Sequence, residues 1–432
     1  MRVLIKSICG SVLAATIVLL AGCRQTPQTN IDPLLWNEIQ HIRAIDDHAH
    51  PVRWVQSGLP DREFDALPVD NMEPSSDPLI LRPNAPQVVE AIKELYGSAD
   101  HKTALMKEKG DAYPAWVLDQ MGVDIMLANR VAMGPSIQPP RFRWVPYADA
   151  LIFPLDNSPL ASVNSDRKSF FALEDILRQR YVSDSGLKTL PATLSQYLSQ
   201  IVTPTLERQK QGGALAEKFE AAYLRSLQFD AVDQSVAEQV YARYMGKKPP
   251  TDSDYKSLQD FLFRYIAAEC GRLGMAVHIH TMAGAGSYFN VAGASPLMLE
   301  SVLDDPKLRH TRFVMIHGGW PFTREITALL QKPNAYLDFS AQDLVLSPAT
   351  LALTIRQWLE WVPEKILFGT DAYPFSDQMG WEESGWIASN TGRRALAIAL
   401  TAMMRDGEIS RDRAAELARM VLRDNARQIY GL

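Results

Sequence analysis

Four short apolar runs, each ending on a residue that can bind a metal ion, constrain the fold of this chain most strongly. They occupy residues 45–50, 275–280, 312–317 and 365–371, and glycine, proline or charged residues bound each of them. Such runs are typical of buried strands in a parallel sheet. The polar residues stand at the carboxyl ends, the end of a parallel barrel that carries its chemistry. These residues are His48, His50, His280, His317 and Asp371.

The pair His48 and His50 favours metal binding over simple packing. Residues two apart on a strand point to the same face, so both imidazoles can bind one ion. A single histidine on an apolar strand is more often an ordinary core residue. Five such residues at one end of the predicted fold favour a metal site. His278 is expected one layer deeper, in a packing or supporting role.

The remaining patterns predict an α/β fold, a closed (β/α)8 TIM barrel of alternating strands and helices. Further strands are expected at 123–128, 144–153 and 335–340, and strand four at 213–219, a segment that also reads as the start of a helix. Two segments, at about 51–121 and 154–213, are too long for ordinary loops. We expect them to be helical insertions after strands 1 and 3, the first of them a lid over the site.

The first residues indicate export. Residues 1–22 combine Arg2 and Lys6, an apolar stretch and small residues before Cys23, as a secretory signal does. The ending 20–23, Leu-Ala-Gly-Cys, resembles a bacterial lipobox and implies lipidation of Cys23; an ordinary signal peptide is the alternative. With Arg24 next, we expect an outer-membrane lipoprotein facing the periplasm. Residues 23–42 would be the lipidated cysteine, a tether and a leading helix, and residues 43–432 the barrel.

Charge and cysteine content exclude two classes of protein. The formal net charge is −6 and no basic stripe is present, which argues against nucleic-acid binding. After loss of the signal and lipidation of Cys23, Cys270 is the one remaining cysteine, so no intrachain disulfide can form. Its apolar helical surroundings are typical of a buried structural thiol.

The motifs together resemble the amidohydrolase superfamily, in particular its amidohydrolase-related branch. They are the His48 and His50 pair and the segments at 277–281, 316–321, 368–374 and 425–431, and the resemblance covers about residues 45–432. It implies a metal-dependent barrel with His48, His50, His280 and Asp371 as ligands, and His317 as a ligand or a substrate-polarising group. In binuclear members a carboxylated lysine from strand four bridges two ions. Lys218 is the candidate for this bridge, with a structural lysine as the alternative.

The ligand types suit Zn, with Mn or Fe as alternatives, and one or two ions. In the implied mechanism a water molecule activated by the metal attacks the substrate, and Asp371 accepts its proton and later delivers it to the leaving group. His317 would steady the developing oxyanion. A small organic substrate would contact side chains near the ligand-bearing ends, and Arg225 could bind a carboxylate. The expected substrate-binding residues are Arg225, Tyr223, Trp320 and Tyr373.

Three functions fit these features. The first is a metal-dependent hydrolase that cleaves a C–N or C–O bond of a small molecule. The second is a non-oxidative decarboxylase of the same branch, which holds an aromatic acid on the metal. The third is a catalytically silent envelope lipoprotein that uses the barrel for binding, although all expected ligands are present. The oligomeric state cannot be read from the sequence.

Overall fold

The computed structural model describes residues 31–55, 61, 63–67, 78–82, 84–284, 286–376 and 379–432. The predicted signal at 1–22, the lipidation of Cys23 and the tether up to residue 30 lie outside these residues. Within the described part of the chain, no helix is both long enough and apolar enough to cross a membrane.

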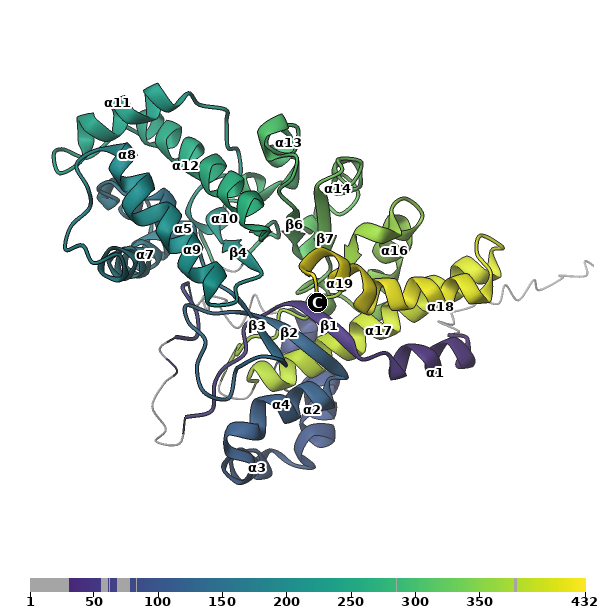
Figure 1. The fold of residues 1–432 in the computed structure, drawn as a ribbon. Helices are drawn as coiled ribbons and strands as arrows, with labels where there is room; N and C mark the ends of the chain where they lie inside the picture. Colours follow the sequence, from purple (N-terminus) through teal and green to yellow (C-terminus); the bar gives the residue numbers. More distant parts are fainter. Residues whose placement is uncertain are drawn as a thin grey trace, which may run out of the picture.

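Parallel strands form the centre of the described chain (Figure 1). The first three pair in the order β1-β2-β3, and the other five pair in the order β4-β5-β6-β7-β8. Every pair is parallel. The strands are β1 (Ala44–Ala49), β2 (Val123–Asn129), β3 (Phe142–Val145), β4 (Ala216–Phe219), β5 (Ala276–His280), β6 (Phe313–Ile316), β7 (Ala335–Asp338) and β8 (Ile366–Leu367).

Backbone hydrogen bonds join the two sheets at both edges. Between β3 and β4, the Leu215 amide donates to the Trp144 carbonyl at 3.0 Å. Between β8 and β1, the Asp47 amide donates to the Phe368 carbonyl at 3.0 Å, and the Asp371 amide donates to the His48 carbonyl at 2.8 Å. The strands therefore close on themselves, and the predicted (β/α)8 TIM barrel is confirmed.

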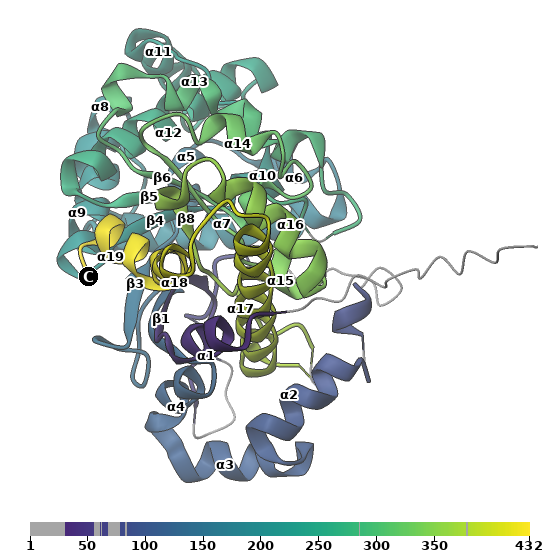
Figure 2. The ribbon, with the colours of Figure 1, turned by 90° about the vertical axis from the view of Figure 1, so that its right-hand side faces the viewer.

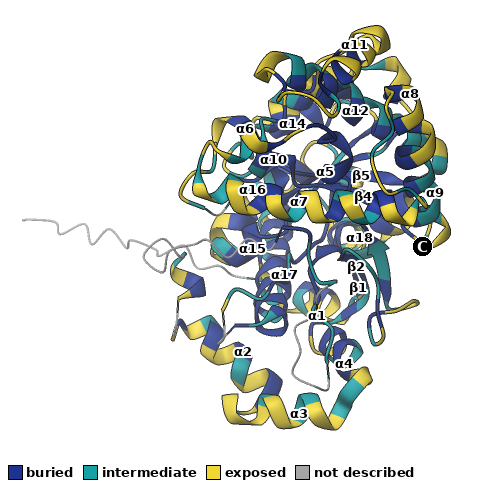
Figure 3. Ribbon diagram, turned by 90° about the vertical axis from the view of Figure 1, so that its left-hand side faces the viewer, coloured by how far each residue is buried: buried dark blue, intermediate teal, exposed yellow. Residues whose placement is uncertain are grey.

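Helices surround the strands, as Figures 1 and 2 show. Figure 3 shows that their exposed residues face outward and their buried residues face the strands, as amphipathic helices require. The helices outside the two insertions are α1 (Pro33–His41), α10 (Ala221–Leu224), α11 (Gln234–Tyr244), α12 (Asp252–Leu273), α13 (Glu300–Leu303), α14 (Ile326–Leu329), α15 (Gln342–Val345), α16 (Pro348–Leu359), α17 (Trp381–Arg405), α18 (Arg411–Arg419) and α19 (Asn425–Tyr430).

The insertion after strand 1 is helical, as expected. It contains α2 (Pro86–Tyr96), α3 (Lys102–Lys109) and α4 (Tyr113–Gln120), which pack on the side of α17 away from the other insertion (Figure 2). Lys102 fastens α3 to the start of α17, with Nζ 3.2 Å from Glu382 Oε2 and 2.8 Å from Glu383 Oε2. This ion-pair cluster ties the insertion to the barrel.

The insertion after strand 3 is also helical, but strand 3 itself differs from the prediction of 144–153. The strand spans only Phe142–Val145, and the apolar residues that follow form α5 (Asp149–Ile152). Pro146 cannot donate to a ladder and ends the strand, while residues 150–153 remain fully buried. A short buried apolar run gives the same pattern for a helix as for a strand. The other helices are α6 (Ser158–Ala161), α7 (Ser165–Asp184), α8 (Leu194–Tyr197) and α9 (Thr203–Gln211).

The core has an inner and an outer part. Side chains such as Ile45, Leu127, Val314 and Leu367 fill the barrel, and a larger cluster packs the strands against the helices. Cys270 is a free, buried thiol of the outer part. Burial raises its pKa, so it is a poor nucleophile.

Candidate metal centre

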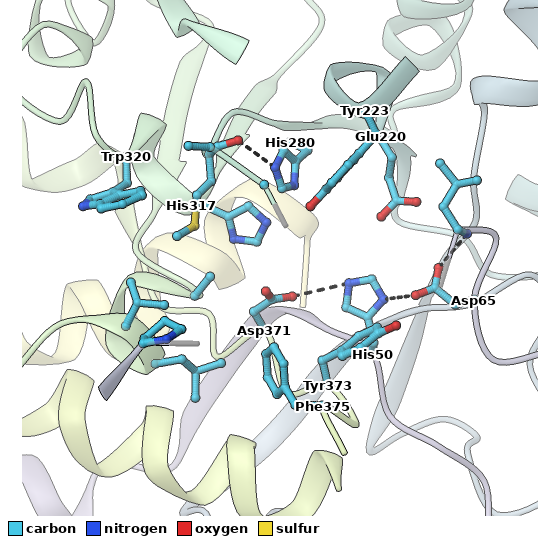
Figure 4. Close-up of a pocket in the computed structure, with 18 of the residues that line it drawn as sticks. His50, Asp65, Glu220, Tyr223, His280, His317, Trp320, Asp371, Tyr373 and Phe375 are labelled. Atoms are coloured by element: carbon cyan, nitrogen blue, oxygen red, sulfur yellow. Dashed lines mark hydrogen bonds and ion pairs between the residues drawn. The ribbon is translucent and has the colours of Figure 1, made fainter. Parts of the chain in front are cut away.

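A cavity of about 270 Å³ opens at the carboxyl ends of the strands (Figure 4). This is the end of a (β/α)8 barrel at which active sites lie. His48 is not among the residues that line this cavity, but it contacts the lining residue Asp371. The lining includes the predicted residues His50, Lys218, Tyr223, His280, His317, Trp320, Asp371 and Tyr373.

His48, His50 and Asp371 can bind one ion together. The ligand atoms of these three residues all lie within 4.8 Å of one another. The Oδ1 atom of Asp371 is 3.2 Å from His48 Nε2 and 3.4 Å from His50 Nε2. His48 lies on β1, His50 directly follows β1, and Asp371 lies in the segment after β8. The barrel makes these two strands neighbours.

Asp65 orients His50. Its Oδ2 atom is 3.0 Å from His50 Nδ1, which places a proton on Nδ1 and leaves a lone pair on Nε2. That lone pair faces the Asp371 carboxylate 3.4 Å away. Two atoms with lone pairs at this separation repel each other unless a proton or a metal ion lies between them, so the geometry fits a divalent ion.

Protonation states in the site also suit a metal. Burial, together with Lys218, lowers the pKa of His48 well below its ordinary value. Burial alone would raise the pKa of Asp371, but His317, His50 and Lys218 hold it below its ordinary value. At neutral pH the site therefore has a neutral His48 imidazole and an ionised carboxylate, the forms that bind metal ions.

His280 and His317 present further lone pairs. His280 Nε2 is 2.9 Å from the Met282 carbonyl, which can only accept, so Nδ1 of His280 is unprotonated. His317 Nδ1 is 2.8 Å from Ser340 Oγ. Because that hydroxyl donates to Asp338 at 2.8 Å, it accepts from His317 and leaves Nε2 of His317 unprotonated. Burial, helped by Lys218, lowers the pKa of His280 to about 3, so its imidazole is neutral.

Asn129 on β2 contacts His48 from behind. Its Nδ2 atom is 2.7 Å from His48 Nδ1 and 3.1 Å from the Ala49 carbonyl. Metal binding through Nε2 of His48 requires a proton on Nδ1. Rotation of the Asn129 side-chain amide would place its Oδ1 atom where it can accept a hydrogen bond from this Nδ1–H group. Oδ1 is buried and makes no hydrogen bond with the described residues.

Two of these residues have a backbone conformation that non-glycine residues rarely adopt. The φ angle is 69° at His317 and 52° at Asp371. His317 is fixed by its amide, which donates to Asp338 Oδ1 at 2.5 Å, and Asp371 by its bond to the His48 carbonyl. Such strain persists only where the surroundings enforce it and is common at functional sites.

Lys218 lies on β4 and faces the cavity, in agreement with the strand interpretation of residues 213–219. It is 1% exposed, and Nζ is 3.2 Å from His48 Nε2. His278, one layer deeper, contacts the Tyr430 hydroxyl at 2.8 Å. The expectation of a supporting position for His278 therefore agrees with this contact.

Arg225 is not brought to the cavity, which corrects the expectation that it binds a substrate carboxylate. Its guanidinium is 2.6 Å from Asp260 Oδ1 and 2.9 Å from Gln259 Oε1, and it covers the ring of Phe229 at 4.4 Å. Its charge is compensated within the protein, so its role is structural. Conversely, Asp65 and Asn129 contact the histidines of the site, and Glu220 lines the cavity, but none of the three carries a sequence signal of the kind that marked the histidines.

A family model described as amidohydrolase matches residues 206–432, more than half of the chain. This chain belongs to the amidohydrolase family. The amidohydrolase is also 27% identical over 184 residues to the protein fluG of Emericella nidulans, an alignment that covers 41% of this chain and 20% of fluG. It thus spans about a fifth of the length of that curated relative.

Solved structures of low sequence identity share the fold. They include a glucuronate isomerase from Caulobacter crescentus (14% identity, TM-score 0.62, covering 92% of this chain and 93% of that one). A uronate isomerase from Thermotoga maritima (13%, 0.58, 92% and 96%) and a chain from Lactobacillus casei classed as a metal-dependent hydrolase (15%, 0.53, 93% and 98%) are also similar. These neighbours differ in reaction, so the fold alone does not specify the chemistry.

The amidohydrolase is therefore an enzyme of this superfamily. With the metal dependence of the family, the group formed by His48, His50 and Asp371 indicates a divalent metal ion.

Proposed function

We propose that this amidohydrolase is a metal-dependent hydrolase that cleaves a C–N or C–O bond of a small organic substrate. The observation that carries the proposal is the 3.4 Å distance between His50 Nε2 and Asp371 Oδ1, two atoms that each present a lone pair to the other. His48, His280 and His317 supply the remaining nitrogen donors, and this donor set favours Zn over Mn or Fe.

A bound divalent ion would polarise a carbonyl group and make a water molecule acidic enough to lose a proton near neutral pH. Asp371, whose lowered pKa keeps its carboxylate ionised, would accept the proton of the attacking water and later deliver it to the leaving nitrogen or oxygen. The unprotonated Nε2 of His317 favours a ligand role for this residue over donation to an oxyanion.

Lys218 decides between one and two ions in this proposal. A second ion requires a bridging ligand near His48, and a carboxylated Lys218 would provide one because Nζ is 3.2 Å from His48 Nε2. With an uncarboxylated ammonium group at this position, the site holds one ion. Metal stoichiometry in the Lys218→Ala variant separates the two cases, since a bridged pair would lose one of its two ions.

The proposed location rests on sequence alone. The residues before Cys23 support lipidation of that cysteine and attachment to the outer membrane, facing the periplasm. Labelling of cells with a radioactive fatty acid tests it: the wild type should incorporate the label and the Cys23→Ser variant should not. Equal labelling of both proteins would contradict the proposal.

Elemental analysis and product analysis test the proposed function. The purified protein should contain about one or two equivalents of Zn, Mn or Fe and should hydrolyse members of a panel of amides, esters and lactones. Asp371→Asn should abolish turnover. Glu217→Gln is the matched control, because Glu217 is a buried carboxyl on β4 that does not line the cavity.

Failure to bind metal under any loading condition would refute the proposal and favour the binding-scaffold alternative. Release of CO₂ from aromatic acids, without hydrolysis of any panel member, would assign the decarboxylase function instead.

A further inference from the structure

Glu220 has no role in the metal site, although its side chain points into the cavity. It follows β4 directly, and its amide donates to Asp149 Oδ2 at 2.7 Å, which fixes its backbone. Figure 4 shows its carboxyl group among the side chains that line the cavity. The residue is only 4% exposed, and it is among the residues that line the cavity.

One oxygen of the Glu220 carboxyl group has no hydrogen-bond partner among the described residues. Among the described lining residues, Asp65 is paired with His50, and Asp371 faces His48 and His50. By contrast, the Oε2 atom of Glu220 is buried and makes no hydrogen bond with any described residue. A buried carboxyl oxygen without a partner is unfavourable, so it is expected to be satisfied by something that enters the cavity.

The charges around the cavity indicate what that partner is. Lys218 is the one basic side chain among the described lining residues apart from the imidazoles, against three carboxyl groups. Two further buried carboxyl groups, Asp149 and Glu174, lie near Glu220. The surroundings of Glu220 therefore favour a positively charged group.

An aromatic ring lines the same cavity as the Glu220 carboxyl group. Tyr223 lies three residues after Glu220, lines the cavity, and packs against His280 and Phe289 with ring centroids 4.7 Å and 5.1 Å away. An ammonium group can contact the face of such a ring while it pairs with a carboxylate. Elsewhere the lining is apolar and includes Leu67, Leu81, Leu344 and Phe375.

We propose that Glu220 binds a primary amino group of the substrate and that the apolar wall holds an aliphatic or aromatic side group. The preferred substrates are then amides or esters of amino-bearing, apolar acids. The choice of bond rests on the proposed hydrolase function, whereas the contact between Glu220 and the amino group does not.

Isothermal titration calorimetry of the metal-loaded protein tests this contact. L-Leucinamide and 4-methylpentanamide are suitable probes, because they differ only by the amino group. L-Leucinamide should bind about tenfold more tightly to the wild type, as expected for a hydrogen bond to a charged group. Glu220→Ala should remove this preference, and Glu220→Gln, which keeps the shape but not the charge, should reduce it several-fold.

Glu217→Gln should leave the tenfold preference unchanged, because the same chemical change is made on β4 away from the cavity. Metal content and thermal unfolding of each variant show that it is folded and loaded. The inference is overturned if the two probes bind the wild type equally, if L-leucinamide does not bind, or if both Glu220 variants keep the preference. The last result would show that the amino group binds the metal ion instead.

Hydrolysis of L-leucine 4-nitroanilide and of panel amides separates this inference from the proposed function. A binding preference that depends on Glu220, without any turnover, would support the amino contact and refute the hydrolase. Turnover without the preference would support the hydrolase and refute the amino contact.

Discussion

Replacing Asp65 by alanine should weaken metal binding without preventing folding of the barrel. Asp65 Oδ2 is 3.0 Å from His50 Nδ1, and its side chain is 1% exposed. Removal of this carboxylate leaves His50 free to rotate and to place its proton on Nε2, the atom that must bind the ion. The Tyr147 hydroxyl, 3.2 Å from His50 Nδ1, offers a weaker replacement.

The expected size follows from this geometry. Loss of a partner that orients a ligating histidine weakens metal affinity by about 10-fold to 100-fold. Asp65→Asn keeps an acceptor oxygen and should lie near the lower value, whereas Asp65→Ala should lie near the upper one. At an ion concentration 100 times the wild-type Kd, metal stabilises the wild type by about 2.7 kcal/mol, and a protein that binds 100-fold more weakly by about 0.4 kcal/mol.

Competition with a chromophoric chelator measures the Kd for Zn, and thermal unfolding with and without metal measures the linked stabilisation. The metal-free forms of the two variants serve as controls, since they report any effect on the fold itself. A Kd within twofold of the wild type, in a folded Asp65→Ala protein, would refute the assignment of His50 as a ligand oriented by Asp65.

Three further changes test other parts of the structure. Lys102→Ala leaves the buried Glu382 and Glu383 without their counter-charge and should destabilise the protein by about 3 kcal/mol in urea unfolding; a loss under about 1 kcal/mol would contradict the role of this cluster. Glu217→Gln should change the pH dependence of stability, because burial raises the pKa of Glu217 well above its ordinary value. The native wild type retains a proton on Glu217 that the unfolded chain releases above a pH of about 4.5. Wild-type stability should therefore fall relative to the variant by up to about 1.4 kcal/mol per pH unit above that value. Unfolding free energies of the two proteins that run parallel from pH 5 to 8 would contradict this. Gly369→Ala would place a Cβ atom 2.7 Å from Asp47 Oδ1 and 2.8 Å from Asp338 Oδ2. The backbone must shift to relieve these contacts, which should displace Asp371 and reduce the metal content. Unchanged metal content would show that the segment adapts.

The sequence was informative where a local pattern and a fold rule coincide. His50, His280 and His317 follow buried apolar runs, and a parallel barrel brings the ends of such runs to one mouth. Their convergence around one cavity required no knowledge of side-chain contacts. Lys218 was predicted from the resemblance to binuclear members of the superfamily, and the strand that carries it could also be read as a helix.

Other features depend on contacts that no local pattern encodes. Asp65 is one of several acidic residues in the segment after β1, and only its position beside His50 distinguishes it. Arg225 was expected to bind a substrate carboxylate, but its pairing with Asp260 on α12 depends on how that helix packs. The end of β3 was misplaced because residues 150–153 are buried as completely in a helix as they would be in a strand.

The hydrogen bonds that close the barrel between its first and last strands have a consequence for how the enzyme folds and binds its metal. Thr370 donates a hydrogen bond to Asp46 across the seam between β1 and β8, although the two residues are 324 positions apart in the chain. Strand β8 contributes only two residues to its ladder. Bringing such distant segments together carries a large entropic cost, so the seam is the natural place for the ring to open. A metal ion held by His48 and His50 on one side and Asp371 on the other would fasten this seam. The ion would then bind only to the completed barrel, since its binding site exists only after the last strand has paired with the first.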